Sequence, residues 1–140
     1  MGQSLNDNIT LTPLQRIFNE KGDILKGLKC SDNGYAGFGE AYFSFIKKGF
    51  IKGWKKHTKM QLNIIVPSGQ IKFYLLDEAT KENKIIIIGN EDYSRLTVKP
   101  GVWMAFEGLD EQNMLLNIAS IEHDPLEAVN EPLEKFLHYF

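Results

Sequence analysis

Short runs of β-branched and aromatic residues, separated by turn-forming residues, make up the chain from about residue 41 onward. The intervening turns read "KKG", "PSG", "GNED", "KPG" and "GLDEQN", which favour tight reversals of the chain. Short strands with such regular turns are typical of antiparallel sandwiches and barrels rather than of βαβ units. The pattern therefore predicts an all-β fold with strands at residues 41–46, 50–54, 61–67, 70–76, 84–89, 94–98, 102–106 and 114–120.

The two ends of the chain follow different patterns. Residues 11–30 are expected to form two extended pieces around a turn at "NEKG". Near the C-terminus, hydrophobic residues recur at helical spacing and predict a short docked helix: Leu133, Phe136, Leu137 and Phe140. The length suits a single core. We therefore expect one domain over residues 1–140, divided into an N-terminal extended arm (1–40), a barrel (41–122) and a C-terminal helical segment (123–140).

Composition and charge narrow the function classes. The formal net charge of −2, from 16 basic and 18 acidic residues, argues against a general nucleic-acid binder. Cys30 is the only cysteine, and His57, His123 and His138 lack metal-ligand spacing, so neither a disulfide framework nor a metal site is predicted. The chain shows no phosphate-binding glycine motif, no secretory signal pattern and no apolar run of ~18 residues. We expect a cytoplasmic protein with no cofactor, no nucleic-acid partner and no membrane contact.

The most informative polar segment is "IKGWKKHTK" at residues 51–59, which carries four lysines and a histidine. In a regular strand Lys55 and His57 share one face, and Lys52 joins them only if the strand bulges. Gly53 is the position where a bulge costs least. Converging basic groups would suit a diphosphate ligand, or a lysine that acts as a base. The alternative is a solvated edge strand whose lysines only prevent aggregation, in a purely structural barrel.

Two further side chains are candidates for a ligand site. Asn117 lies within "MLLNIAS", an otherwise apolar strand, so its amide either satisfies a backbone group or faces a ligand cavity. Trp103 follows a Pro-Gly turn in "KPGVWMAF" and belongs either to the core or rim of the fold or to a platform that stacks on a nucleobase. His123 and His138 are expected to be surface or hydrogen-bonded histidines.

The order of four segments carries a family resemblance: "GEAYFSFIKKGFIKGWKKH", "LNIIVPSGQIKFYLLDE", "RLTVKPGVWMAF" and "LLNIASIEHDPLEA". This succession resembles the dTDP-4-dehydrorhamnose 3,5-epimerase family of cupins over about residues 10–128. It is also similar to the smaller cupins that act as sugar-nucleotide 3,4-ketoisomerases. The resemblance implies a double-stranded β-helix, or jelly-roll, barrel. It further implies a homodimer that acts on a nucleotide-linked 4-keto sugar in surface-polysaccharide biosynthesis.

The resemblance also assigns roles in the lysine-rich segment. The "R-G-x-H" strand of the epimerases reads "KGWK" here, so Lys52 takes the place of the arginine that contacts the nucleotide phosphates. Lys55 falls where the epimerases keep their catalytic histidine. His57 matches the second histidine of the ketoisomerase "H-x-H" pattern. Lys21 stands near an N-terminal arginine of the family's "D-x-R-G" turn.

Other positions depart from the family's usual residues. Met104 replaces a histidine in "KPGVWMAF", and Asn117 aligns with the tyrosine that acts as an acid in the epimerases. Epimerisation beside a ketone needs a base, a proton donor, and groups that stabilise the enolate. Asparagine cannot donate as an acid, so Tyr42, or less readily Tyr74, would have to supply the missing hydroxyl.

These assignments lead to one main hypothesis and one rival. The chain is expected to be a sugar-nucleotide epimerase or isomerase that abstracts a proton next to the ketone. The catalytic candidates are Lys55, His57, Asn117 and Tyr42, and the substrate-binding candidates are Lys52, Lys21, Glu40, Asn63, Trp103 and Arg95. The rival is a non-catalytic cupin that binds a sugar nucleotide or a carbohydrate and has lost the usual histidine–tyrosine pair.

Overall fold

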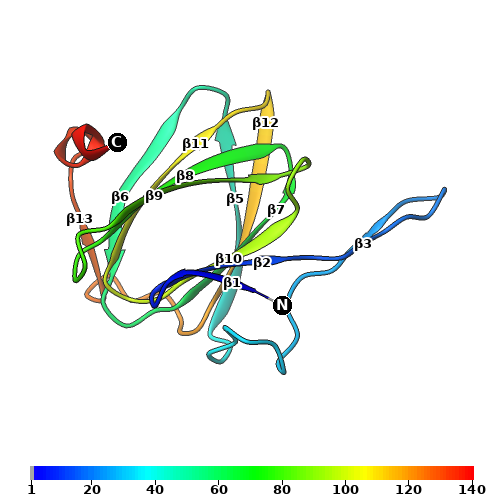
Figure 1. The fold of residues 1–140 in the computed structure, drawn as a ribbon, viewed down its shortest axis with the longest axis horizontal. Coiled ribbons are helices and arrows are strands. Elements are labelled where there is room, and N and C mark those ends of the chain that lie inside the picture. Colours follow the sequence, from blue (N-terminus) through cyan, green and yellow to red (C-terminus); the bar gives the residue numbers. More distant parts are fainter. Residues whose placement is uncertain (1) are drawn as a thin grey trace.

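The computed structural model describes residues 2–140, whose strands form two antiparallel sheets that face each other (Figure 1). The six-stranded sheet has the order β1 (Gln3–Asn6), β2 (Ile9–Pro13), β10 (Ser94–Val98), β7 (Leu62–Ser68), β12 (Gln112–Ala119) and β5 (Glu40–Lys47). The five-stranded sheet has the order β13 (Ala128–Asn130), β6 (Ile51–His57), β11 (Val102–Gly108), β8 (Gln70–Asp77) and β9 (Asn83–Gly89). The predicted all-β class is therefore confirmed.

All eight predicted strands are present, and the largest change in bounds is at β6, which continues past the expected end at residue 54 to His57. The expected boundary between an N-terminal arm (1–40) and the barrel (41–122) does not match the structure, because β1 and β2 belong to the six-stranded sheet. β2 pairs with β10 from Ile9↔Val98 to Pro13↔Ser94, and Ile9 is fully buried in the core. The strand joins the barrel because burial of Ile9 and the ladder to β10 satisfy both its side chains and its backbone.

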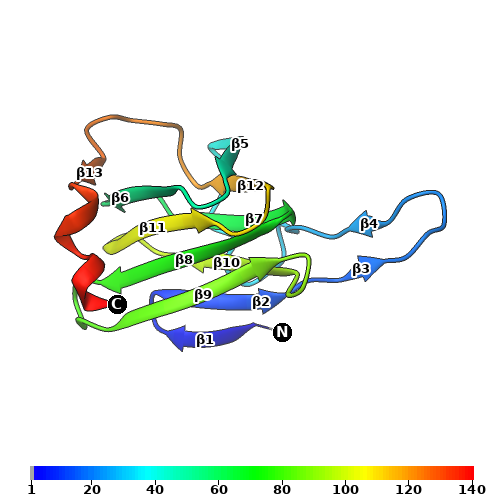
Figure 2. The same ribbon diagram turned by 90° about the horizontal axis from the view of Figure 1, so that it is seen from above.

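A two-stranded hairpin follows β2 and projects from the barrel, at the opposite end of the molecule from the C-terminal coil (Figures 1 and 2). It consists of β3 (Arg16–Ile17) and β4 (Ile24–Leu25), which pair in antiparallel register. In its turn the Gly22 amide donates to the Asn19 carbonyl at 2.8 Å. The two extended pieces predicted around "NEKG" are thus confirmed.

The hydrophobic residues form two separate clusters. The larger cluster lies between the two sheets and includes Ile71, Phe73 and Leu75 of β8. The alternate residues of the same strand, Tyr74 and Leu76, point to the outer face and belong to the second cluster. β8 is therefore buried on both faces, which requires something to cover its outer side.

The C-terminal segment provides that cover. It contains two 3₁₀ turns, η1 (Leu133–Lys135) and η2 (Leu137–Tyr139), in place of the regular helix that the spacing suggested. Figure 1 shows this coil beside β6 and the ends of β8 and β9. Its hydrophobic residues pack against the second cluster, so the predicted docking of a short C-terminal helical segment is confirmed. Among residues 2–140, no helix is long and apolar enough to cross a membrane.

Candidate functional site

A bulge in β6 determines which of its side chains point into the barrel. Met104 of β11 pairs with Lys55, but Phe106 pairs with Lys52, so β6 contains one residue more than β11 over this stretch. Gly53 lies in the bulge, where a Cβ would collide with Ala105. The conditional prediction of a bulge at Gly53 is confirmed, and Lys52 consequently reaches the same cavity as Lys55 and His57.

This cavity, here called the His57 cavity, lies between β6 and β11 of one sheet and β5, β7 and β12 of the other. Its volume is about 280 Å³. Its polar lining includes Tyr42, Lys52, Lys55, His57, Asn117 and Asn130, but no aspartate or glutamate. β13 pairs with Lys55–His57 of β6, so the alternative of an exposed edge strand does not hold for this part of the strand.

His57 is held by a carboxylate that the sequence did not single out. Its Nδ1 lies 2.8 Å from Oε1 of Glu127, and Glu127 is 3% exposed. Oε2 of Glu127 accepts from the amides of Lys59 at 3.0 Å and Met60 at 2.9 Å. Burial alone would raise the pKa of Glu127, but the hydrogen bond from His57 and these two amides lower it to about 2.

The ionised Glu127 decides the tautomer of His57. A carboxylate without a proton can only accept, so Nδ1 of His57 must carry the hydrogen and donate it. In the neutral ring Nε2 is then the unprotonated nitrogen, free to take a proton from a ligand in the cavity. The pair therefore has the arrangement of a general base oriented by a carboxylate.

Across the cavity, Asn117 and Tyr42 form a second polar pair. The two residues are directly opposed on β12 and β5, and Nδ2 of Asn117 donates to the Tyr42 hydroxyl oxygen at 3.0 Å. Because that oxygen accepts from Asn117, the O–H of Tyr42 is left to donate elsewhere. Oδ1 of Asn117 is buried and has no hydrogen-bond partner. Among residues 2–140 it is the only buried side-chain oxygen or nitrogen found without one. Such an atom in a cavity wall indicates a ligand donor.

The two lysines of the cavity differ in their contacts. Nζ of Lys52 donates to the Phe45 carbonyl at 2.6 Å and to Oγ of Ser44 at 3.3 Å. The Lys55 ammonium has no hydrogen-bond or ion-pair partner within the part of the chain described. No carboxylate lines the cavity, so its wall carries two uncompensated positive charges and suits an anion.

The structure places the other predicted site residues away from this cavity. Asn63 alternates with Leu62 and Ile64, which line the cavity, so its side chain points to the outer face of the sheet. Trp103 alternates with Met104 in the same way and lies in the outer cluster, where Nε1 donates to Glu78 at 2.9 Å.

Glu40 and Lys21 are held apart from the cavity for different reasons. Glu40, at the start of β5, accepts from the His123 amide at 2.9 Å through Oε1. Lys21 is exposed in the turn of the β3–β4 hairpin, where its amide donates to Oδ1 of Asn19 at 2.9 Å. Neither residue is among those that line the His57 cavity.

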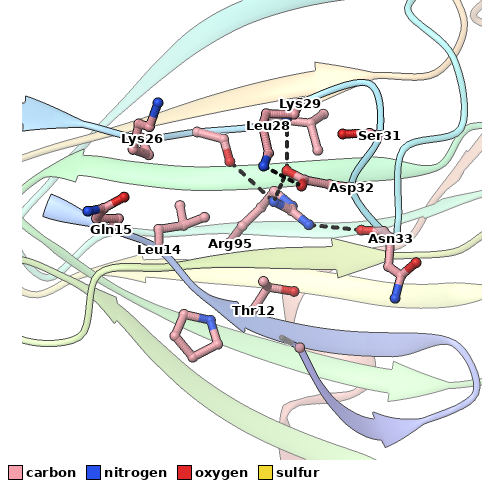
Figure 3. Close-up of a pocket in the computed structure, with 13 residues that line it drawn as sticks. Thr12, Leu14, Gln15, Lys26, Leu28, Lys29, Ser31, Asp32, Asn33 and Arg95 are labelled. Carbon is pink, nitrogen blue, oxygen red and sulfur yellow. Dashed lines mark hydrogen bonds and ion pairs between the residues drawn. The ribbon is translucent and has the colours of Figure 1, made fainter.

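Arg95 lines a second and larger cavity, of about 490 Å³, on the outer side of the six-stranded sheet (Figure 3). Its Nε donates to Oδ1 of Asn63 at 3.1 Å, Nη1 to the Gly27 carbonyl at 3.2 Å, and Nη2 to the Asn33 carbonyl at 2.9 Å. Nη1 also lies 3.5 Å from Oδ2 of Asp32. These bonds anchor the loop at residues 26–33 to the sheet, so the larger cavity has the contacts of a structural network.

Sequence reasoning missed Glu127 and Asn130. Both lie in a segment that pairs with β6 through the registers Ala128↔His57 and Asn130↔Lys55. The short β13 has no alternating pattern that would predict a strand, and Glu127 lies 70 residues after His57. A glutamate just before an apolar pair is too common a pattern to have indicated this contact.

Comparison with known proteins identifies the family. The family profile described as "FdtA: WxcM-like, C-terminal" matches residues 7–140. No curated protein matches the chain. Among solved structures, a dTDP sugar isomerase from Desulfovibrio desulfuricans G20 is 27% identical, with a TM-score of 0.88 over 92% of this chain and 87% of that one.

Two more distant structures share the fold. QdtA, a sugar 3,4-ketoisomerase from Thermoanaerobacterium thermosaccharolyticum in complex with TDP, is 22% identical, with a TM-score of 0.78 over 91% of this chain and 90% of that one. A dTDP-4-dehydrorhamnose 3,5-epimerase from Sulfolobus tokodaii is 18% identical, with a TM-score of 0.82 over 96% and 86%. These likenesses confirm the cupin jelly-roll barrel and the resemblance drawn from the sequence. The chain belongs to the WxcM-like, C-terminal (FdtA) family.

Proposed function

We propose that this protein is an isomerase or epimerase that acts on a nucleotide-linked 4-keto sugar by moving a proton on the carbon next to the ketone. The observation that carries the proposal is the His57–Glu127 pair, in which the carboxylate holds Nδ1 of a histidine that lines a cavity with two lysines. The similarity to a dTDP sugar isomerase supports the same class of substrate. Lys52 would contact the diphosphate, in keeping with its position in the family pattern.

In the proposed reaction, Nε2 of His57 takes the proton from the carbon beside the ketone and the electron pair moves onto the ketone oxygen. Glu127 stabilises the imidazolium that forms. The Tyr42 hydroxyl and the Lys55 ammonium are the donors available to the enolate oxygen. Return of the proton to carbon gives the isomer, so the reaction consumes no cofactor. Oδ1 of Asn117 would accept a hydrogen bond from a sugar hydroxyl.

The test is incubation with dTDP-4-keto-6-deoxyglucose in D₂O, followed by proton NMR of the sugar ring. We expect deuterium at a ring carbon adjacent to the ketone. His57→Asn should abolish the incorporation, whereas His123→Asn, at an exposed histidine outside the cavity, should retain it. Exchange that is unchanged in His57→Asn would contradict the assigned base.

The position of the label separates the possible reactions. Deuterium at C3 and C5 with inversion would indicate 3,5-epimerisation, and deuterium at C4 with the ketone moved to C3 would indicate 3,4-ketoisomerisation. Other nucleotides and other 4-keto sugars belong in the same series. No incorporation with any of them would reject proton abstraction.

A non-catalytic cupin that binds a sugar nucleotide is the second candidate. It is favoured by Asn117, Lys55 and Met104, which line the cavity where the family resemblance expects a tyrosine and two histidines. Under this alternative, calorimetry should show dTDP binding that weakens in Lys52→Ala, without deuterium incorporation into any sugar.

We also propose that the protein is a homodimer. Tyr42 and Ser44 of β5 face the cavity, so the alternate residues Phe43 and Phe45 point outward, where they are 60% and 67% exposed. Two aromatic side chains on an outer sheet face would gain from coverage by a second copy. Sedimentation should give a dimer that Phe45→Lys weakens. We further propose a role in surface-polysaccharide biosynthesis in the cytoplasm, the compartment expected for a sugar-nucleotide enzyme of this class.

A further inference from the structure

The outer face of β6 is covered by the C-terminal segment, and Trp54 is the residue that joins the two. Trp54 is 1% exposed and lies directly after the bulge residue Gly53, between Lys52 and Lys55. Its indole packs in the outer cluster, and Trp54 is also among the residues that line the His57 cavity. Trp54 is therefore next to the site residues along the chain, and it also contacts the C-terminal segment.

Several independent contacts fasten Trp54 to the C-terminal segment. Its Nε1 donates to the Leu133 carbonyl at 2.7 Å, and its ring meets Phe136 edge-on at 5.5 Å and stacks on Phe140 at 5.8 Å between centroids. The backbone is fastened too, because the Trp54 amide donates to the Glu131 carbonyl at 3.2 Å and the Glu131 amide to the Trp54 carbonyl at 3.1 Å. A buried indole N–H needs such a partner.

We propose that the C-terminal residues 133–140 hold the bulged form of β6, and that Trp54 is the positioning residue through which they aim Lys52, Lys55 and His57 into one cavity. A bulge leaves a strand with an incomplete ladder, so its geometry needs support from outside the sheet. The contacts of Trp54 with Leu133, Phe136 and Phe140 provide that support. The proposal concerns the shape of the cavity wall, and it does not depend on whether the protein converts a sugar nucleotide or only binds one.

The division of the hydrophobic residues separates this role from a general role in folding. The core between the sheets contains none of Trp54, Leu133, Phe136, Leu137 or Phe140. Loosening the C-terminal segment should therefore leave that core intact and act on the outer face of the five-stranded sheet, where Phe140 contacts Trp54 of β6 and Tyr74 of β8. A segment that merely completed the fold would instead affect all strands together.

The test compares Phe140→Ala and Trp54→Phe with Tyr139→Ala. Trp54→Phe keeps an aromatic ring but removes the N–H donor to Leu133 and part of the packed ring surface. Tyr139 is a matched control, because it is an aromatic residue of the same segment, is 52% exposed, and has no ring contact with Trp54. Hydrogen–deuterium exchange of the backbone is measured by mass spectrometry for peptides covering β6 and, for comparison, β2 and β10.

We expect exchange in β6 to become about tenfold faster in Phe140→Ala and about threefold faster in Trp54→Phe, with β2 and β10 unchanged. Tyr139→Ala should behave as the wild type. The proton NMR signal of the His57 Nδ1–H, which donates to Glu127, should weaken in Phe140→Ala and persist in the control.

Two results would overturn the proposal. Unchanged exchange of β6 in both variants would show that the C-terminal segment does not hold the strand. Equal acceleration in every strand, or outright unfolding, would show that the segment belongs to the folding core. Neither result depends on sugar turnover, so the proposed reaction can fail while this inference stands.

Discussion

The His57 cavity and the Arg95 cavity each surround a basic side chain paired with a carboxylate, yet they differ in what they leave unpaired. Arg95 donates to Asn63, Gly27 and Asn33 as well as facing Asp32, and its bonds tie a loop to the sheet. In the smaller His57 cavity, Oδ1 of Asn117 and the Lys55 ammonium have no partner among residues 2–140. A buried polar atom without a partner in a cavity wall, such as Oδ1 of Asn117, indicates a ligand, whereas the three paired nitrogens of Arg95 indicate a structural role.

The largest expected effect is on turnover in Glu127→Gln. A glutamine amide can donate to Nδ1 of His57, which would move the ring hydrogen to Nε2 and block the base. We expect kcat with a 4-keto sugar nucleotide to fall by about 10² to 10⁴-fold, with a much smaller change in KM.

The control for that variant is Glu78→Gln, which removes a carboxylate that pairs with Lys56 at 2.6 Å outside the cavity. It should keep most of the activity. An equal loss in both variants would mean that charge in general, and not the contact with His57, matters for turnover.

Arg95→Met should lower the stability of the protein without changing ligand binding, in contrast to substitutions in the His57 cavity. It leaves Oδ1 of Asn63 and the carbonyls of Gly27 and Asn33 without the guanidinium donor. We expect a loss of about 3 kcal/mol in the free energy of unfolding, measured by urea denaturation. The affinity of the folded protein for dTDP should not change. A loss of affinity would show that the Arg95 cavity takes part in binding.

Glu127 should also make stability depend on pH. Its pKa is about 2 in the folded protein and 4.5 ordinarily, so its contribution is fully present above about 4.5 and is lost as the pH falls toward 2. We expect roughly 3 kcal/mol. Urea denaturation should show the gap between wild type and Glu127→Gln narrowing through this window. A gap that stays constant would mean that Glu127 is not ionised in the folded state.

The smallest effect is expected for Lys52→Ala, which should raise the Kd for dTDP by about tenfold, the equivalent of one charge-assisted contact. Added salt should reduce the difference, because Lys52 is exposed. Lys59→Ala, an exposed lysine of the same segment that does not line the cavity, is the matched control. An equal rise in the Kd of both variants would mean that net charge, and not a specific contact of Lys52, accounts for the effect.

The local pattern of hydrophobic and turn-forming residues was enough to predict much of the fold. Alternation and turn residues predicted the strands from β5 to β12, and the same rule grouped Lys55 with His57. It also named Gly53 as the position where a bulge would cost least, and the structure has a bulge there, where a Cβ would collide with Ala105. By contrast, Asn63, Trp103 and Arg95 were expected to bind substrate, and the structure turns each to the outer side of its sheet.

By itself, the sequence determined the strands from β5 to β12, which residues of a strand share a face, and the basic group on β6. These follow from a backbone period of two, which any short window of residues reveals. Only the tertiary structure decided that Glu127 is hydrogen-bonded to His57, Tyr42 to Asn117, and the C-terminal segment to Trp54. Such contacts join residues 70 or more positions apart, and they depend on the register between strands, which no local pattern encodes.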